Sequence, residues 1–110
     1  MEKRPCVYML ASARNVTLYV GVNSNLIGRV YQHRQGLLDA FTKKYLVHIL
    51  ACFEVHERIE SAILRDKQIK KWPRIFKKRL IEQYNPDWHD LWADLVSPSL
   101  AAGFRQSLPE

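Results

Sequence analysis

Residues 17–36 read Thr-Leu-Tyr-Val-Gly-Val-Asn-Ser-Asn-Leu-Ile-Gly-Arg-Val-Tyr-Gln-His-Arg-Gln-Gly, and this stretch decides the fold. Thr17 to Val22 is β-branched and aromatic, which predicts a strand. Asn23-Ser24-Asn25 then offers helix N-caps, and the helix is predicted to run from about Leu26 to Gln35, closed by Gly36. Its apolar stripe consists of Leu26, Ile27, Val30 and Leu37.

Apolar runs on both sides of this stretch predict two further strands. Cys6 to Leu10 precedes a small, polar turn at Ala11 to Asn15, so it should pair with the strand at Thr17 to Val22 as an antiparallel hairpin. Residues 37–44 read as a loop, and Tyr45 to Val55 is rich in β-branched and aromatic residues. The sequence therefore predicts three strands, two of them in a hairpin.

Two longer helices and one short amphipathic segment are predicted in the second half of the chain. The helices cover roughly Glu57 to Lys71 and Arg74 to Tyr84, separated by Pro73 and ended by Asn85-Pro86. The residues expected to face inward are Ile59, Ala62, Ile63 and Ile69 in the first and Phe76, Leu80 and Ile81 in the second. The short segment contains Trp88, Leu91, Trp92 and Leu95.

The length of 110 residues predicts one domain, with residues 1–96 as its body and residues 97–110 as a mobile tail. Cys6 and Cys52 are too few for a disulfide framework or a zinc cluster, and both lie in apolar runs. Buried free thiols and a reducing cytoplasm fit this pattern. No secretory signal and no membrane span follow Met1, so we expect a cytoplasmic protein.

The formal net charge of +6 favours a polyanionic partner, because neutralising phosphates supplies most sequence-independent affinity for nucleic acids. A basic surface that only keeps the protein soluble is the alternative. The basic residues gather in one stretch around Trp72, at Lys67, Lys70, Lys71, Arg74, Lys77, Lys78 and Arg79. This stretch resembles a phosphate-tracking surface, although it spans two predicted helices and cannot all face one ligand.

Asp66 is the most unusual polar residue, because it falls near the middle of the apolar stripe of its predicted helix. A carboxylate in that place needs a partner, since an isolated buried charge is very costly. A lysine, an arginine or a helix N-terminus would serve, and so would a divalent cation bound by carboxylate oxygens.

Five residues of the first two strands and the first helix are further candidates. Tyr8 and Tyr19 lie on neighbouring strands, where tyrosine is common as a packing residue. Gly21 inside a strand often marks a close backbone approach. Arg29 could clamp a phosphate and His33 could transfer a proton, or both could be surface residues without a role.

Several short motifs, in order and spacing, resemble the GIY-YIG nuclease superfamily, and most closely its stand-alone, single-domain bacterial members. The resemblance covers about residues 5 to 92. The motifs are Cys6-Val7-Tyr8, with cysteine in place of glycine, Tyr19-Val20-Gly21, Asn25-Leu26-x-x-Arg29-x-x-x-His33, Phe41-Thr42-Lys43-x-Tyr45, Lys67-Gln68-Ile69-Lys70-Lys71-Trp72 and Asn85-Pro86-Asp87-Trp88-x-Asp90-Leu91.

This resemblance implies a small α/β (α+β) domain, in which helices flank a three-stranded antiparallel sheet. It also implies Mg²⁺- or Mn²⁺-dependent hydrolysis of phosphodiester bonds in DNA, in repair or recombination. Tyr8 and Tyr19 would orient or deprotonate water, Arg29 would stabilise charge on the phosphate, and His33 would assist proton transfer or hold phosphate. Gly21 and Asn85 would support the site. The expected nucleic-acid contacts are Lys43, Lys67, Lys70, Lys71, Arg74 and Lys77.

The family places a metal-binding glutamate where this chain has Asp66, which is one methylene shorter. The metal site is therefore rearranged, weakened or lost. If Asp66 binds a metal, we expect its carboxylate to point into a pocket shared with Tyr8, Tyr19 and Arg29. The rival hypothesis is a nucleic-acid-binding module with a degenerate catalytic centre. A third hypothesis is a protein-interaction module that uses a face around Trp88 and Trp92. We expect a monomer without an obligate protein partner.

Overall fold

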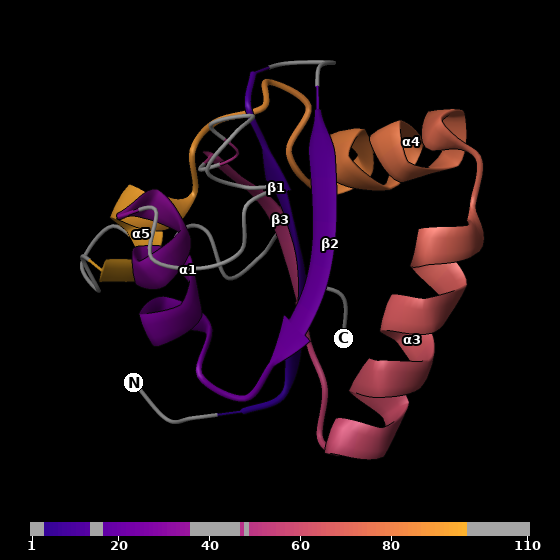
Figure 1. The fold of residues 1–110 in the computed structure, drawn as a ribbon. Helices are drawn as coiled ribbons and strands as arrows, with labels where there is room; N and C mark the ends of the chain where they lie inside the picture. Colours follow the sequence, from indigo (N-terminus) through magenta and orange to yellow (C-terminus); the bar gives the residue numbers. More distant parts are fainter. Residues whose placement is uncertain (1–3, 14–16, 36–46, 48, 97–110) are drawn as a thin grey trace.

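The structure is a computed structural model that describes residues 4–13, 17–35, 47 and 49–96. Its elements, labelled as in Figure 1, are β1 (Cys6–Ala11), β2 (Leu18–Asn23), α1 (Leu26–Arg34), β3 (Ile49–Val55), α3 (Ile59–Lys71), α4 (Arg74–Tyr84) and α5 (Trp92–Val96). The predicted loop at residues 37–44 with Lys43, His48 and the predicted tail at residues 97–110 lie outside the described residues. Within the described part of the chain, no helix is long and apolar enough to cross a membrane.

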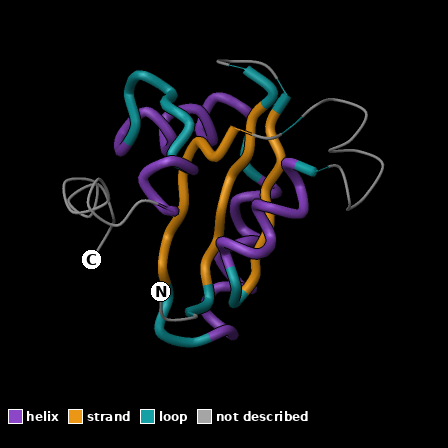
Figure 2. The backbone as a smooth tube through the Cα atoms, turned by 90° about the vertical axis from the view of Figure 1, so that its left-hand side faces the viewer, coloured by secondary structure: helices purple, strands orange, loops and turns teal. Residues whose placement is uncertain are grey.

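The three strands form one antiparallel sheet in the order β2-β1-β3, and Figure 2 shows them side by side. In the register of this sheet, Tyr8 of β1 stands opposite Gly21 of β2 and Phe53 of β3. Every residue of the central strand β1 is buried. The predicted fold class, a three-stranded antiparallel sheet flanked by helices, is confirmed.

Helices cover both faces of the sheet, with α1 and α5 on one side and α3 and α4 on the other (Figure 1). Successive side chains of a strand point to opposite faces, so β1 divides its residues between two clusters. Val7 and Met9 pack with residues of α3 and α4, while Tyr8 and Leu10 pack with residues of α1 and α5. Tyr8 is therefore held on the α1 side of the sheet.

Helix α1 starts at the predicted cap. The side-chain oxygen of Asn25 accepts a hydrogen bond from the Gly28 N–H at 3.3 Å, which satisfies one of the free donors of the first turn. A Cβ added at Gly28 would lie 2.6 Å from Asn25 Nδ2, so glycine leaves room for this cap. The cap sets where the helix begins, and thereby where Arg29 and His33 lie along it.

The predicted inner face of α3 is partly wrong. Ile59 and Ile63 are each 39% exposed, while the residues facing the sheet are Ala62, Asp66 and Ile69. Arg65 reaches Glu54 of β3, and this contact turns the helix toward the stripe that contains Ala62 and Asp66. In α4, Leu80 and Ile81 are buried as predicted, but Phe76 is 45% exposed.

Candidate active site

Tyr8, Tyr19 and His33 form one aromatic cluster on the α1 side of the sheet. Tyr8 Oη lies 3.1 Å from His33 Nε2, and the Tyr19 and His33 ring centroids are 5.0 Å apart in an edge-on arrangement. Tyr8 and His33 are buried, whereas Tyr19 is half-buried. Among these three side chains, Tyr19 is therefore the most accessible to a substrate.

Gly21 makes the position of the Tyr8 phenol possible. It faces Tyr8 across the β1–β2 pair, and a Cβ added there would lie 2.5 Å from Tyr8 Oη and 3.1 Å from Tyr19 Cε1. A side chain at this position would displace one or both phenols. The close approach indicated by a glycine within a strand is thus an approach of the tyrosine side chains.

The hydrogen bond between Tyr8 and His33 has a direction that depends on the histidine proton. When His33 Nε2 carries no proton it accepts from the phenolic O–H, and it can then take that proton as a base. His33 lies in the last turn of α1, where the helix dipole favours a positively charged imidazole. The pair can therefore move a proton between phenol and imidazole.

Arg29 lies one helical turn before His33, which places the two on the same side of α1. Its side chain is half-exposed, and no hydrogen bond or ion pair joins it to another residue in the described ranges. A guanidinium in this state keeps its planar set of donors for an incoming anion, and phosphate oxygens match that geometry.

Asp66 is buried in the α3 layer, and one of the predicted partners is present. Its Oδ2 forms an ion pair with Lys70 Nζ at 3.0 Å, whereas its buried Oδ1 has no hydrogen-bond partner among the described residues. A carboxylate oxygen left without a donor suits a divalent cation. Among the described residues, no group of three histidine, cysteine or acidic side chains could hold a metal. Water and phosphate oxygens are further ligands that Mg²⁺ or Mn²⁺ at Asp66 would accept.

The expected pocket shared by Asp66, Tyr8, Tyr19 and Arg29 is not found among the described residues. Asp66 lies between Ala62 and Ile69 on the stripe of α3 that packs against the sheet, and Tyr8 faces the opposite side of that sheet. The reason is the pleat of β1, which sends Tyr8 toward α1 and its neighbours toward α3. Asp66 and Tyr8 are therefore separated by the sheet.

Asn85 supports the fold close to β3. Its side-chain amide donates to the carbonyl oxygens of Ala51 at 2.8 Å and His89 at 2.9 Å, and its oxygen accepts from the His89 N–H.

Trp88 is buried in the core and donates its indole N–H to Glu82 at 2.8 Å. The hypothesis of an exposed interaction face at Trp88 is therefore wrong, because that ring is part of the core.

The predicted nucleic-acid contacts within the described residues lie around the end of α3 and the start of α4. Lys67, Lys70, Lys71 and Arg74 are exposed. Lys77 is half-buried and donates to the carbonyl oxygen of Lys70 at 3.4 Å, which brings its ammonium group to the C-terminal end of α3.

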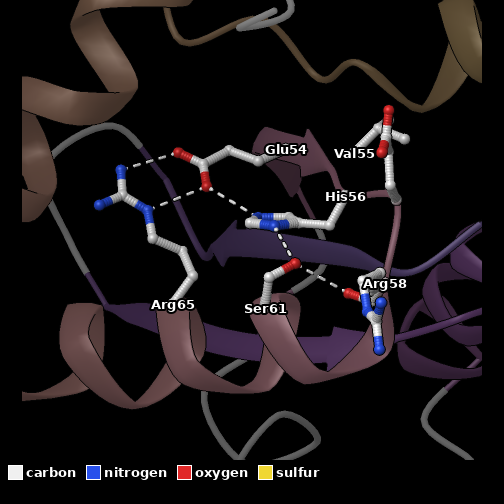
Figure 3. Close-up of a pocket in the computed structure, with 7 residues that line it drawn as sticks. Glu54, Val55, His56, Arg58, Ser61 and Arg65 are labelled. Carbon is white, nitrogen blue, oxygen red and sulfur yellow. Dashed lines mark hydrogen bonds and ion pairs between the residues drawn. The ribbon is translucent and has the colours of Figure 1, made fainter.

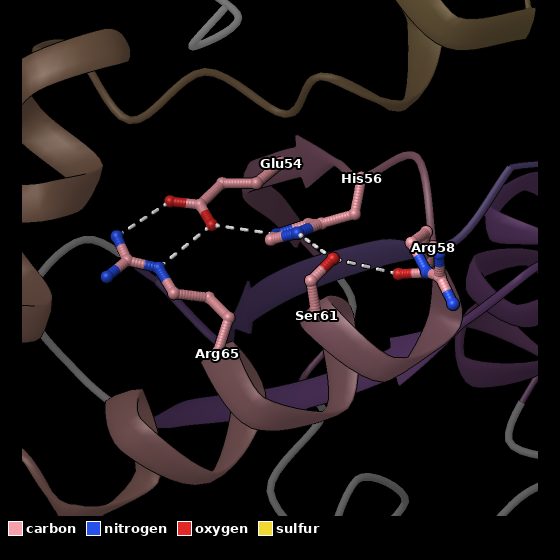
Figure 4. Close-up of polar contacts among 5 residues, drawn as sticks. All are labelled: Glu54, His56, Arg58, Ser61 and Arg65. Atoms are coloured by element: carbon pink, nitrogen blue, oxygen red, sulfur yellow. Dashed lines mark hydrogen bonds and ion pairs between the residues drawn. The ribbon is translucent and has the colours of Figure 1, made fainter.

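Sequence reasoning missed a polar network at the other end of α3 that lines a pocket of about 510 Å³ (Figure 3). The buried Glu54 carboxylate accepts two hydrogen bonds from the Arg65 guanidinium, at 3.0 and 2.9 Å. His56 lies between Glu54 and Ser61, 3.4 Å from the first and 3.2 Å from the second, as Figure 4 shows. The network ties the end of β3 to the first turns of α3.

A sequence signal for this network existed. Glu54 is a charged residue inside an apolar strand, and His56 follows it by two residues, the spacing of one strand face. Ser61 and Arg65 are four apart on a helix, so they share a face as well. The hydrogen bond to Glu54 raises the pKa of Arg65, which keeps the guanidinium charged.

We expect Arg65→Gln to lower the free energy of unfolding by about 2–3 kcal/mol, because it leaves the buried Glu54 carboxylate without its partner. Adding Glu54→Gln should recover part of this loss, since the unpaired charge is then removed. Urea denaturation of the two variants measures both effects. Arg58→Gln is the matched control, because the 77% exposed Arg58 side chain forms only a surface pair with Glu60. A cost of Arg65→Gln no larger than that of Arg58→Gln would contradict the prediction.

Both cysteines are free and buried, as the sequence predicted. Burial raises the pKa of Cys6 to about 11 and that of Cys52 to about 12. Both thiols therefore stay protonated at neutral pH, and neither is a nucleophile in the native fold.

Comparisons with known proteins show the family of this chain. The family model described as GIY-YIG catalytic domain matches residues 4–85, and the chain belongs to that family. The chain is 27% identical over 90 residues to the UvrABC system protein C of Mycoplasmopsis agalactiae. The aligned region covers 82% of this chain but only 14% of that protein. The chain is 24% identical over 104 residues to a UPF0213 protein of Aeromonas salmonicida, covering 93% of this chain and 76% of that protein. No solved structure matches the chain.

The predicted resemblance is confirmed by these matches. The stretch that matches the family model includes the cluster of Tyr8, Tyr19 and His33, together with Arg29 and Asp66. The UPF0213 match extends over nearly the whole chain, in agreement with the predicted likeness to stand-alone members.

Proposed function

We propose that this protein is a metal-dependent endonuclease that hydrolyses phosphodiester bonds in DNA. The observation that carries the proposal is the hydrogen-bonded cluster of Tyr8 and His33 with Tyr19, beside Arg29, within the part of the chain that matches a family of catalytic domains. A proton acceptor and a phosphate clamp are the two groups that such a hydrolysis requires.

In this mechanism the half-buried Tyr19 orients the attacking water, and Tyr8 takes a proton from that water while its own phenolic proton passes to His33 through their hydrogen bond. Arg29 holds the phosphate and stabilises the negative charge that grows on its oxygens. Asp66 would hold Mg²⁺ or Mn²⁺, and the cation would supply positive charge and make bound water more acidic, on the side of the sheet opposite Tyr8.

A direct test is incubation of the protein with labelled flap, branched, single-stranded and duplex DNA at low salt, with and without Mg²⁺ or Mn²⁺. Metal-dependent cleavage by the native chain and its loss in Tyr19→Phe would support the proposal. Tyr19→Phe removes only the hydroxyl, so the ring still packs beside His33. Cleavage that survives this change would remove Tyr19 from the mechanism.

A nucleic-acid-binding module without cleavage activity is the second candidate. The ion pair between Asp66 and Lys70 favours it, because the lysine ammonium occupies one carboxylate oxygen that a metal would use. The separation of Asp66 from Tyr8 by the sheet favours it as well. If the protein binds DNA but cleaves none of the DNA structures, with Mg²⁺ or with Mn²⁺, the result would select this candidate.

The similarity to a UvrABC system protein lends support to a role in DNA repair, although the chain spans only 14% of that relative. Recombination is the other pathway that we proposed from the sequence. The monomeric state and the cytoplasmic location stay predictions.

We expect DNA binding to weaken steeply as salt rises, since phosphate neutralisation releases counterions. Lys67→Gln and Lys71→Gln should each lower the log–log salt slope on duplex DNA by roughly 0.9. Both side chains are exposed, so neither change should affect the fold. Fluorescence anisotropy across a salt series measures the slope. Arg58→Gln, at the opposite end of α3, is the control, and a flat salt response of the native chain would refute nucleic acid as the partner.

A further inference from the structure

A second pocket, of about 470 Å³, lies between the end of α3 and the outer face of α4, away from the tyrosine cluster. Its lining combines aromatic, cationic and amide side chains: Arg65, Trp72, Phe76, Arg79, Leu80 and Gln83. The volume is within the range of pockets that hold small organic groups. A ligand that is flat and polarisable, with hydrogen-bonding groups at its edge, would match this lining.

Each aromatic ring of the pocket has a guanidinium beside it. The Arg65 guanidinium carbon lies 5.0 Å from the Trp72 ring centroid, and that of Arg79 lies 5.6 Å from the Phe76 ring centroid. Planar guanidinium groups and aromatic rings both offer flat surfaces on which another ring can stack. Phe76 is 45% exposed, which leaves a large apolar face in water.

The pocket is largely organised in advance. Glu54 holds the Arg65 guanidinium through two hydrogen bonds, and this fixes the group that lies against Trp72. On α4, Phe76 and Gln83 are seven residues apart with the buried Leu80 between them, so they line one face of the helix. Ordering the Arg65 side chain on binding therefore costs little, which favours affinity.

We propose that this pocket binds an unpaired nucleobase, stacked on the exposed ring of Phe76 beside the Arg65–Trp72 pair, with its edge at the Gln83 amide. The inference rests on nucleic acid as the partner in the proposed function, and it adds the class of substrate: DNA with single-stranded or unpaired bases. Every base has a face that can stack on an aromatic ring, and the Gln83 amide has both a donor and an acceptor for a base edge.

The charges around the pocket match this occupant. Arg65 and Arg79 line it, and the exposed Lys70 and Lys71 directly precede Trp72 in the chain. Cations next to a stacking surface neutralise the phosphates on either side of a bound base, as in proteins that bind single strands. Arg65 and Lys70 are paired with Glu54 and Asp66, but Lys71 and Arg79 form no ion pair among the described residues. An apolar side chain of a protein partner would leave these two cations without counter-charges, so it fits the pocket less well.

The test compares three ligands of equal length by fluorescence anisotropy at low salt: a single-stranded oligonucleotide, the same backbone with abasic sites, and a duplex. We expect the native chain to bind the base-bearing single strand more tightly than the abasic strand. Phe76→Ala should weaken binding of the base-bearing strand roughly 5- to 100-fold and leave the abasic strand unchanged. Phe76→Trp should keep the affinity, because it preserves a stacking surface, while Phe76→Leu should not.

Ile75→Ala is the matched control, because Ile75 is the neighbouring residue of α4, is 48% exposed and does not line the pocket. Equal effects of Ile75→Ala and Phe76→Ala would overturn the inference, and so would Phe76→Leu binding as tightly as Phe76→Trp. Binding of DNA without any preference for bases would overturn the nucleobase pocket alone. No binding of any DNA would overturn nucleic acid as the partner, and circular dichroism of each variant verifies the fold.

Discussion

Arg29→Ala should lower the rate of DNA cleavage by roughly 10²- to 10³-fold, the usual cost of removing one donor that stabilises charge in a transition state. The half-exposed guanidinium makes no hydrogen bond or ion pair within the described residues, so its loss leaves no buried partner unsatisfied. The free energy of unfolding should therefore change by no more than about 0.5 kcal/mol. Single-turnover cleavage and urea denaturation of the same preparation measure the two effects separately.

Arg29→Lys and Gln32→Ala are the informative companions of this variant. Lysine keeps the charge but lacks the planar pair of donors, so Arg29→Lys should recover only part of the rate. Gln32 is exposed on the same helix, and its truncation should leave cleavage unchanged. A rate for Arg29→Ala equal to that of the native chain would remove Arg29 from the mechanism.

Asp66→Ala should abolish metal-dependent cleavage, and Asp66→Glu should raise it. Glutamate adds the methylene by which this chain differs from the family pattern, and misplacement on the ångström scale can cost roughly a hundredfold in rate. The fold should tolerate the loss of the carboxylate, because its partner Lys70 has a side chain that is 53% exposed and can return to water. Cleavage as a function of Mg²⁺ and Mn²⁺ concentration measures the effect.

Other outcomes for position 66 would each lead elsewhere. A metal held through a water would be crowded by the longer side chain, and Asp66→Glu would then cleave more slowly than the native chain. Cleavage by Asp66→Ala at the native rate would show that the position carries no metal chemistry. If neither the native chain nor Asp66→Glu cleaves any DNA structure, the second candidate, a binding module, replaces the nuclease.

Much of the fold could be predicted because it is recorded in local patterns. The predicted helix at Arg74 to Tyr84 has the bounds of α4, and the strand and helix of residues 17–35 are found within a residue of their predicted ends. Turn residues, helix caps and apolar periodicity each determine the structure of a single helix, strand or turn, so they can be recognised in a short stretch of sequence. Of the predicted third strand at Tyr45 to Val55, β3 covers Ile49–Val55, Val47 is not part of a strand, and residues 45, 46 and 48 lie outside the described residues.

Contacts between elements could not be predicted in the same way. Ile59 and Ile63 fit an apolar stripe on α3, yet the helix turns Ala62 and Asp66 toward the sheet. The rotation of a helix about its own axis depends on what its partner surface offers, and here Glu54 of β3 binds Arg65. The burial of Trp88 and the exposure of Phe76 follow from packing between elements too.

The sequence by itself determined the order of strands and helices, the cap that starts α1, and the family motifs that include Tyr8, Tyr19 and Arg29. These features depend on spacing along the chain, which fixes geometry within a strand or a helix. Only the tertiary structure decided that Tyr8 meets His33, that Lys70 pairs with Asp66, and that Arg65 joins Glu54 to Trp72. Such pairings depend on which face each element turns to its neighbour, and that is settled by the packing of the whole domain.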